Sequence, residues 1–439
     1  MIMIPLFNEQ TQVGSIKRAD DGPQIRYTNA WRASTKAFPI SLSMPLSAED
    51  WDTNVSVPWL MNLLPEGEPL RAMTQALGVA REDILGLILE TGRDLAGALT
   101  IGQQPPQNHP DLILISTPDA LERIINEMPA KPFLVGEDGV SMSLAGAQEK
   151  LPLTMRDGNL AIPINGAAST HILKPDNPRL PGSVQNEALC MVLARRCGLP
   201  TADVITGIAG ERSYLLVTRY DRFDDNGRTR RLHQEDFCQA LGRPPAAKYE
   251  HDGTGQRGPS LADMFNLVRA HMTALDLTRF LDAAIFNIAV GNVDSHAKNY
   301  SILLKPTRSE LAPLYDLMSG LTWLNITQNH AQDVGGQRRG RHIYARHWRR
   351  LAESAGLSGT ATVRRVSRVT ERILRELPAA INEVAAMPAG STLLDVFADA
   401  IAERTRLIRE NALRPDGDDT VGETAANLQD EMRINGSYG

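Results

Sequence analysis

The sequence predicts an α+β protein whose strand-rich first half leads into a mostly helical second half. Its 439 residues are enough for two to three domains, each with a hydrophobic core. Short apolar runs broken by Gly, Pro and Asp-Gly turns dominate the first half, whereas apolar residues recur at helical spacing from residue 261 onward. We therefore expect a small α+β module over 1–104, a second lobe over 109–245, a helical lobe over 246–414 and a disordered polar tail over 415–439.

The composition is that of a soluble globular protein. Hydrophobic residues make up 42% and charged residues 22%, and the net charge of −6 provides no global attraction to nucleic acid. No apolar stretch approaches the roughly 20 residues that cross a bilayer, and the first ten residues lack the features of a signal peptide. Cys190, Cys197 and Cys238 are odd in number and show no metal-binding spacing. We expect a protein of the reducing cytoplasm with no membrane partner.

The first module shows strand and helix patterns but no catalytic constellation. Strands are expected at 13–16 and 40–42, and helices near 58–64, 68–77 and 81–89, before a linker at 103–108. The expected role of this module is therefore docking or support of the following lobe.

The second lobe begins with a run of small residues at 141–150, SMSLAGAQEK, expected between two strands. Small side chains let backbone N–H groups approach a phosphate closely, and Lys150 could add a positive charge, although a plain β-turn explains the run equally well. Farther on, a strand carries Lys174 among apolar neighbours, and a helix from about 185 to 196 carries Glu187 near its start. A strand Lys paired with a helix Glu is the ion pair that positions a nucleotide phosphate in kinases, and a surface salt bridge is the alternative.

The end of this lobe offers a possible hinge. A strand over 214–218 enters a polar turn through 222, where backbone groups could meet an adenine. The later GTGQRG at 253–258 matches G-x-G-x-x-G, but a polar segment precedes it instead of an apolar strand, so we expect a flexible loop.

The segment 285–316 carries the most specific chemical pattern. An apolar run ends at Gly291, Asp294, His296 and Asn299 follow, and two short strands lead to Asp316. This spacing is typical of phosphotransferases, in which the first Asp orients or deprotonates the attacking hydroxyl and the Asn and later Asp hold Mg²⁺. His296 could contact a phosphate. The alternatives are loop residues that satisfy turn backbones, or a metal-dependent hydrolase that uses Asp294, His296 and Asp316.

One further cluster is strongly basic. Residues 338–350, RRGRHIYARHWRR, could contact nucleic-acid phosphates, but a solvated basic helix face is the favoured interpretation.

Taken together, the sequence resembles the HipA-type serine/threonine kinase toxins of bacterial toxin–antitoxin systems. The similar phrases are NLLPEGEPLR (62–71), SLAGAQEKLPL (143–153), THILKP (170–175), NEALCMVLARRCGL (186–199), QEDFCQALG with KYEHDG (234–253), GNVDSHAKNYS (291–301) and LYDLMS (314–319). They extend in the family's order to about residue 410. The resemblance implies a two-lobed protein-kinase-like fold, related to lipid kinases, with a small N-terminal module packed on it.

The resemblance also implies roles for individual residues. Asp294 matches the catalytic Asp, Asn299 and Asp316 the magnesium ligands, and Lys174 the nucleotide lysine. The loop 143–150, with Ala145, Gly146, Ala147, Gln148 and Lys150, matches the phosphate loop, and Ser143 matches an autophosphorylation site whose modification ejects that loop. Thr218, Tyr220 and Asp221 fall at the hinge; Thr218 stands where the family has an acidic residue, so backbone contacts are expected there.

The implied activity is transfer of the ATP γ-phosphate to a serine or threonine of a translation protein, such as glutamyl-tRNA synthetase, with arrest of growth. The implied partners are a HipB-like helix-turn-helix antitoxin and, mainly through it, operator DNA. The residues leave two other classes open: a catalytically silent nucleotide-binding corepressor of a DNA-binding partner, and the metallohydrolase.

Overall fold

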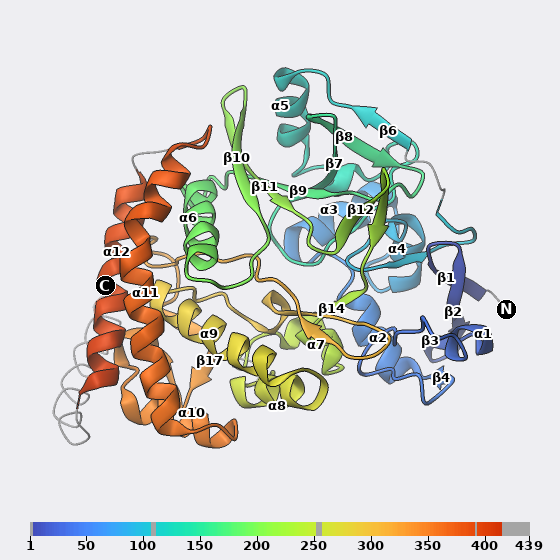
Figure 1. Cartoon of the computed structure of the whole chain (residues 1–439). Coiled ribbons are helices and arrows are strands. Elements are labelled where there is room, and N and C mark those ends of the chain that lie inside the picture. The colour runs from blue at the N-terminus through green and yellow to red at the C-terminus, as the bar shows by residue number, and fades with distance from the viewer. Residues whose placement is uncertain (1–2, 107–110, 252–256, 391–392, 415–439) are drawn as a thin grey trace, which may run out of the picture.

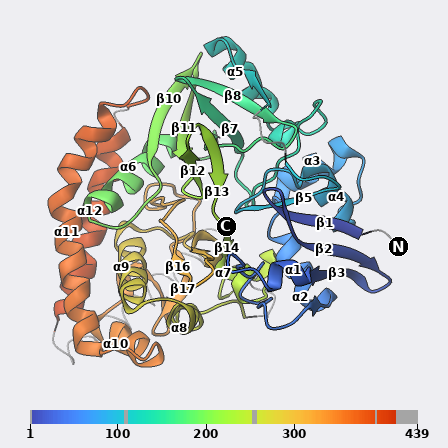
Figure 2. The same ribbon diagram turned by 45° about the vertical axis from the view of Figure 1, so that its right-hand side comes forward.

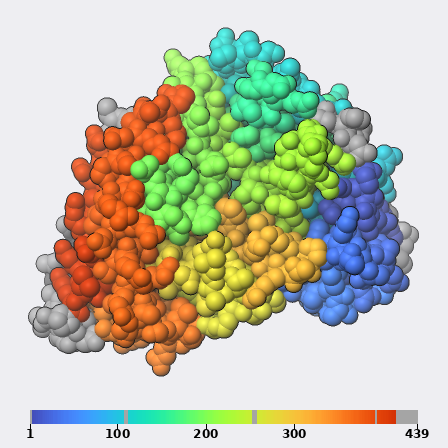
Figure 3. Space-filling model, in the orientation of Figure 1, coloured from blue at the N-terminus to red at the C-terminus, as the bar shows by residue number. Residues whose placement is uncertain are grey.

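The computed structural model describes residues 3–106, 111–251, 257–390 and 393–414, and it divides into three packed parts (Figure 1). The predicted tail, part of the predicted linker and most of the predicted loop at 253–258 lie outside the described residues. Figure 3 shows the N-terminal residues at one side of the visible face and the C-terminal helices at the opposite side.

The N-terminal module is an antiparallel sheet covered by short helices. Its strands, in the order β4-β3-β2-β1-β5, are β1 (Met3–Asn8), β2 (Thr11–Ala19), β3 (Gly22–Tyr27), β4 (Asp50–Trp51) and β5 (Leu99–Ile101). Its helices are α1 (Asn29–Arg32), α2 (Thr53–Met61), α3 (Gly67–Leu77) and α4 (Ile84–Thr91). Alternate residues of these strands join residues of α2 and α4 in one core cluster that lies within residues 4–101.

The second lobe is built on a six-stranded antiparallel sheet in the order β10-β11-β9-β7-β8-β6 (Figure 2). The strands are β6 (Asp111–Leu114), β7 (Leu151–Arg156), β8 (Asn159–Ile164), β9 (His171–Pro175), β10 (Val204–Ala209) and β11 (Arg212–Thr218). Helix α5 (Pro118–Glu127) and the 3₁₀ turn η1 (Pro132–Leu134) follow β6, and α6 (Ser183–Arg196) connects β9 to β10. The small-residue run at 141–150 therefore follows a 3₁₀ turn and not the strand expected before it.

Small β-elements join this lobe to the helical one. They are the hairpin β12 (Arg222–Asp225) and β13 (Arg228–Arg231), and the sheet of β14 (Gln234–Asp236), β15 (Ser301–Leu303) and β16 (Glu310–Leu311). The short α7 (Phe237–Ala240) and η2 (Pro245–Ala247) precede the helical lobe.

The helical lobe contains α8 (Leu261–His271), α9 (Ala274–Val290), α10 (Ala345–Ser354), α11 (Gly359–Ala385) and α12 (Leu393–Leu413). Capping boxes begin α8 at Ser260 and α9 at Thr273, so polar side chains satisfy the first free N–H groups of both helices. The apolar faces of α8, α9, α11 and α12 share one core with α6. Among the described residues, no helix is both long and apolar enough to cross a membrane.

Two further expectations about elements were wrong. Residues 40–42 form no strand, because side chains are the hydrogen-bond partners of their backbone. The backbone N–H of Ile40 donates to the Tyr27 hydroxyl, and the Ile40 carbonyl contacts His233 Nε2 at 2.9 Å. The basic cluster at 338–350 is not one helix face. It crosses β18 (Gln337–Arg339), which pairs with β17 (Asn329–Val334), then η4 (Gly340–His342) and the start of α10, and His342, His347 and Trp348 are buried.

Candidate active site

A cavity of about 770 Å³ lies between the sheet of the second lobe and the loops that follow α9. Most of the predicted site residues line it, although they come from segments far apart in the sequence. They are Ala145, Gly146, Ala147, Gln148, Lys150, Lys174, Thr218, Tyr220, Asp221, Asp294, His296, Asn299 and Asp316. Two predicted residues, Ser143 and Glu187, are buried outside this lining.

The loop that carries Asp294 begins where α9 ends. Gly291 closes the helix in the left-handed conformation, with φ of 72°. The amide of Asn287 on α9 donates to Tyr300 Oη at 2.7 Å, and Asn287 Oδ1 accepts from Asn292 Nδ2 at 2.9 Å. Asn292 Oδ1 in turn accepts from the backbone N–H of Asp294 at 3.2 Å. This buried chain of hydrogen bonds fixes the backbone from which Asp294 projects.

The Asp294 carboxylate points into the cavity and has one close partner. Tyr249 donates its hydroxyl to Asp294 Oδ1, and the Tyr249 ring packs edge-on against His296 with centroids 5.0 Å apart. Desolvation by the cavity walls raises the pKa of Asp294, and the Tyr249 hydrogen bond opposes that rise. A carboxylate with a raised pKa is better suited to accept a proton from a hydroxyl.

His296 is buried beside Asp294, with Nε2 3.9 Å from Asp294 Oδ1. Burial lowers its pKa to about 3, assisted by the nearby positive charge of Lys248, so the imidazole is neutral at pH 7. Its Nδ1 is buried without a hydrogen-bond partner among the described residues. A neutral ring here can brace the loop or donate one hydrogen bond.

Asn299 and Asp316 supply oxygen atoms to the same region of the cavity. The Asn299 side-chain nitrogen donates to the Asp294 carbonyl at 2.8 Å, which leaves the amide oxygen as the free end of the side chain. Burial opposes the charge of Asp316, but the ammonium groups of Lys174 and Lys150 outweigh it and hold the Asp316 pKa well below its usual range. Asp316 also has a positive φ of 57°, a left-handed conformation that is uncommon for residues other than glycine. An amide oxygen and an ionised carboxylate are the donors that fit Mg²⁺.

Lys174 connects the two lobes through an ion triad, in which Lys174 and Glu187 are buried and Asp316 is half-buried. From β9, its Nζ lies 2.6 Å from Glu187 Oε1 on α6 and 2.7 Å from Asp316 Oδ1. Burial disfavours the ammonium, but the two carboxylates reverse that effect and raise the Lys174 pKa. The structure therefore brings together the strand Lys and helix Glu expected from the sequence, as a buried pair and not a surface salt bridge.

The small-residue loop, residues 141–150, runs along the cavity wall. Lys150 returns over it and donates to the Ala145 carbonyl at 2.7 Å, and burial together with Lys174 lowers the Lys150 pKa to about 8. Gly146 has φ of 106°, a conformation that favours glycine. Ser143 is fully buried, and its hydroxyl donates to the Leu63 carbonyl of the N-terminal module at 2.9 Å.

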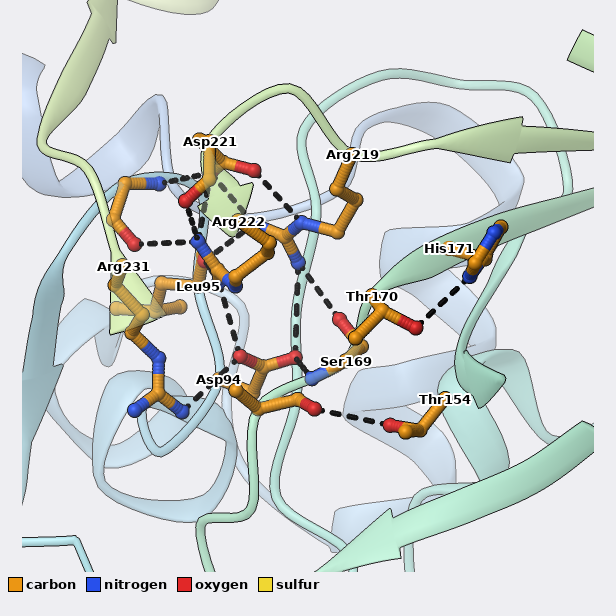
Figure 4. Close-up of polar contacts among 12 residues, drawn as sticks. Asp94, Leu95, Thr154, Ser169, Thr170, His171, Arg219, Asp221, Arg222 and Arg231 are labelled. Carbon is orange, nitrogen blue, oxygen red and sulfur yellow. Dashed lines mark hydrogen bonds and ion pairs between the residues drawn. The ribbon is translucent and has the colours of Figure 1, made fainter. Parts of the chain in front are cut away.

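At the predicted hinge, the Asp221 side chain is held by contacts within the protein. Its carboxylate binds Arg219 and Arg222 and accepts from the backbone N–H of Gly97 at 2.8 Å (Figure 4). The same arginines, with Arg231, surround the buried carboxylate of Asp94. The Asp221 carbonyl is occupied as well, because it accepts from the backbone N–H of Leu232 at 2.9 Å and from Arg222 Nη1 at 3.1 Å. Tyr220 stacks on Tyr315 with ring centroids 5.9 Å apart, and Thr218 is exposed at the end of β11.

Sequence reasoning gave no role to several residues at the site. Tyr249 and Lys248 lie in the phrase KYEHDG and line the cavity, and Lys248 Nζ pairs with Glu66 Oε2 at 2.9 Å. The buried Lys298 binds Asp236 Oδ2 at 3.0 Å and also Asn62, which lies in the N-terminal module. The only available signal was the presence of these residues in the phrases that resemble the HipA family.

The two lobes, the interlobe cavity and the ion triad define a protein with the two-lobed, protein-kinase-like fold. Comparison with known proteins gives the family. Residues 5–102 match the HipA N-terminal domain, and residues 142–381 match the HipA-like C-terminal domain. The chain belongs to the HipA-type kinases.

Relatives of similar length agree with this assignment. The chain is 38% identical over 392 residues to the putative kinase Y4mE of Sinorhizobium fredii, covering 87% of this chain and 92% of that protein. It is 32% identical over 377 residues to the serine/threonine-protein kinase toxin HipA of Shewanella oneidensis, covering 83% and 84%. A solved complex of Shewanella oneidensis HipA, HipB and operator DNA contains a chain that superposes with a TM-score of 0.82 at 26% identity, covering 93% of this chain and 99% of that one.

Proposed function

We propose that the protein is an ATP-dependent serine/threonine protein kinase that acts as the toxin of a toxin–antitoxin pair. The observation that carries the proposal is the convergence of Asp294, Asn299 and Asp316 with Lys174 and the small-residue loop on one cavity. This set supplies the groups that phosphoryl transfer requires, namely an acceptor for the hydroxyl proton, oxygen ligands for a metal, and a lysine for the nucleotide phosphates.

In this mechanism, Asp294 orients the hydroxyl of a serine or threonine and accepts its proton as the hydroxyl oxygen attacks the γ-phosphorus and ADP leaves. Lys174 and Lys150 bind the nucleotide phosphates, and the backbone of 218–221 receives the adenine. Asn299 and Asp316 would hold Mg²⁺, which when bound neutralises charge on the phosphates. Most of the rate enhancement then comes from positioning and electrostatics.

The partners follow from the relatives. Because the Shewanella oneidensis HipA was solved with HipB and operator DNA, we propose a HipB-like helix-turn-helix antitoxin for this chain, with operator DNA contacted mainly through it. We further propose a protein of the translation machinery, such as glutamyl-tRNA synthetase, as the substrate, and autophosphorylation of Ser143 as self-inactivation. Since Ser143 is buried here, the small-residue loop would have to move before that hydroxyl could be modified.

The first prediction tests the catalytic assignment. Asp294→Asn keeps the shape and an acceptor for Tyr249 but removes the proton acceptor, so phosphate transfer from radiolabelled ATP should fall by at least about 100-fold. The exposed Asp119→Asn serves as the control and should transfer phosphate as the wild type does. Undiminished labelling in Asp294→Asn would refute the assignment.

The same assay separates the other two classes. A silent corepressor would bind ATP and label no protein, and a metallohydrolase would release phosphate without forming a phosphoprotein.

A further inference from the structure

The N-terminal module reaches the candidate active site through two segments, and both form hydrogen bonds with the small-residue loop. The first is residues 62–66, where the Leu63 carbonyl accepts from Ser143 Oγ at 2.9 Å and the Glu66 N–H donates to the Gly146 carbonyl at 3.0 Å. The second is Asp94, whose N–H donates to the Ser141 carbonyl and whose carbonyl accepts from the Ser143 N–H, both at 3.1 Å. The loop is thus held on two sides by backbone of another module.

Each of these two segments also contacts other parts of the second lobe or of the helical lobe. The Asp94 carboxylate lies among Arg219, Arg222 and Arg231, and it accepts from the backbone N–H of Ser169 at 3.1 Å (Figure 4). Burial opposes its charge, but these arginines outweigh it and lower the pKa of Asp94. Asp94 therefore holds the loop with its backbone while its side chain is fixed beside the hinge.

Residues 62–66 are anchored to the loops around Asp294. Asn62 is buried, and its oxygen accepts from Lys298, which lies between Asp294 and Asn299 in the sequence. Its amide nitrogen donates to the carbonyls of Pro58 and Arg243, both at 2.8 Å. The Glu66 carboxylate pairs with Lys248 at 2.9 Å and lies 3.9 Å from Lys298 Nζ. A single short segment of the N-terminal module thus contacts both the small-residue loop and the catalytic loop.

We propose that Asn62–Glu66 and Asp94 form a clamp through which the N-terminal module positions the small-residue loop for nucleotide binding. The clamp also restrains movement of this loop away from the cavity. This inference rests on the proposed kinase function. Glu66 is a positioning residue in this scheme, because it acts through Lys248 and through the loop backbone. The same clamp limits self-modification, since Ser143 can meet a phosphoryl donor only after its hydrogen bond with Leu63 has broken.

The clamp can be tested by hydrogen–deuterium exchange of peptides from 141–150 in the purified chain. Glu66→Ala removes the anchor to Lys248, and Ser143→Ala removes the bond to Leu63. Each hydrogen bond contributes about 1 kcal/mol, so exchange in this loop should accelerate roughly fivefold in either variant. The matched control is Glu68→Gln, because the Glu68 side chain is 74% exposed and pairs with Arg71 on the surface.

Kinetics provide a second readout that a general loss of structure would not reproduce. In Glu66→Ala the KM for ATP should rise several-fold while kcat stays within about twofold of the wild type, since a loosened loop weakens nucleotide binding. Glu66→Gln keeps a hydrogen-bond acceptor for Lys248, so its KM for ATP should lie between those of the wild type and Glu66→Ala. This variant also keeps the prediction testable if Glu66→Ala folds poorly.

Unchanged exchange at 141–150 in both Glu66→Ala and Ser143→Ala would overturn the clamp. Faster exchange that extends equally through β1 and β2 would also overturn it, because the module would then be unfolding as a whole. If the wild type transfers no phosphate, the kinase proposal fails, and the exchange data still decide whether the clamp exists.

Discussion

Lys174 lies between two carboxylates that come from different lobes, so its charge has a structural role in addition to the nucleotide contact proposed for it. Without it, the buried Glu187 and the half-buried Asp316 would face each other with no ammonium between them. Removing one partner of a buried ion pair is costly because the remaining charge is left without compensation.

Lys174→Met should therefore lower the free energy of unfolding by about 3–5 kcal/mol. Nucleotide binding should weaken as well. Denaturant titration measures the first effect and calorimetric titration with ADP the second. Lys131→Met, which breaks the exposed pair of Lys131 with Glu137, should change neither quantity. A Lys174→Met variant as stable as the wild type would contradict the stabilising role of the ion triad.

In the proposed mechanism, Lys150 should make nucleotide binding dependent on pH. Its pKa is lowered to about 8, and only the protonated form carries the charge that attracts a phosphate. As pH rises from 7 to 9, this ammonium is lost, and the affinity for ADP should fall roughly threefold to tenfold. Lys150→Arg keeps its charge throughout this range, so a comparison of the two titrations isolates the effect. The same pH dependence in both proteins would assign it to another group.

At the scale of the element, the end of α9 sets the position of Asp294. Gly291 has φ of 72°, and a Cβ at this residue would lie 2.5 Å from side-chain atoms of Leu321. Gly158, in the turn between β7 and β8, has a similar φ of 80° but open space around its Cβ position.

Gly291→Ala should destabilise the protein by about 1–3 kcal/mol and lower kcat, because the strain is released through the backbone that carries Asp294. Gly158→Ala should show a comparable or smaller destabilisation with unchanged kcat. Thermal unfolding and steady-state kinetics of the two variants provide the comparison. Equal kcat values would show that the end of the helix does not control the position of Asp294.

The helices were the elements most accessible from sequence. The apolar periodicity of 261–272 and 277–290 predicted α8 and α9, and the capping residues Ser260 and Thr273 place their starts a little more exactly than periodicity can. The strand expected at 40–42 failed because alternation alone does not reveal whether another strand lies within reach. Ile40 is buried, yet its backbone partners are Tyr27 and His233, whose positions depend on the folded chain.

The candidate site was predictable to the extent that its residues lie in short, characteristic spacings. Asp294, Asn299 and Asp316 follow one helix, and Lys174 and Glu187 lie in consecutive elements. Tyr249 and Glu66 were given no role, since each acts through a contact with a segment distant in sequence. Such contacts depend on how the lobes pack, which local patterns do not encode.

At the scale of the whole molecule, the charge cluster around Asp94 connects the N-terminal module to the second lobe. Asp94→Asn removes the negative charge that compensates Arg222 and Arg231, and it should destabilise the protein by about 3–5 kcal/mol. Asp50→Asn is the control, because Asp50 pairs with Arg26 on the exposed surface of the same module. Chemical denaturation gives both values. Equal stability of the two variants would show that the charge of Asp94 does not stabilise the contact between the N-terminal module and the second lobe.

Helix α6 would lose packing partners if the proposed nucleotide-binding lobe were separated from the helical lobe. Its residues from Ser183 to Ala194 are all buried, and it shares its core with α9, α11 and α12 (Figure 2). A fragment that ends near residue 245 would expose one whole apolar side of this helix to water. Such a fragment should aggregate or bind a chaperone, and nucleotide affinities are best measured on the intact chain.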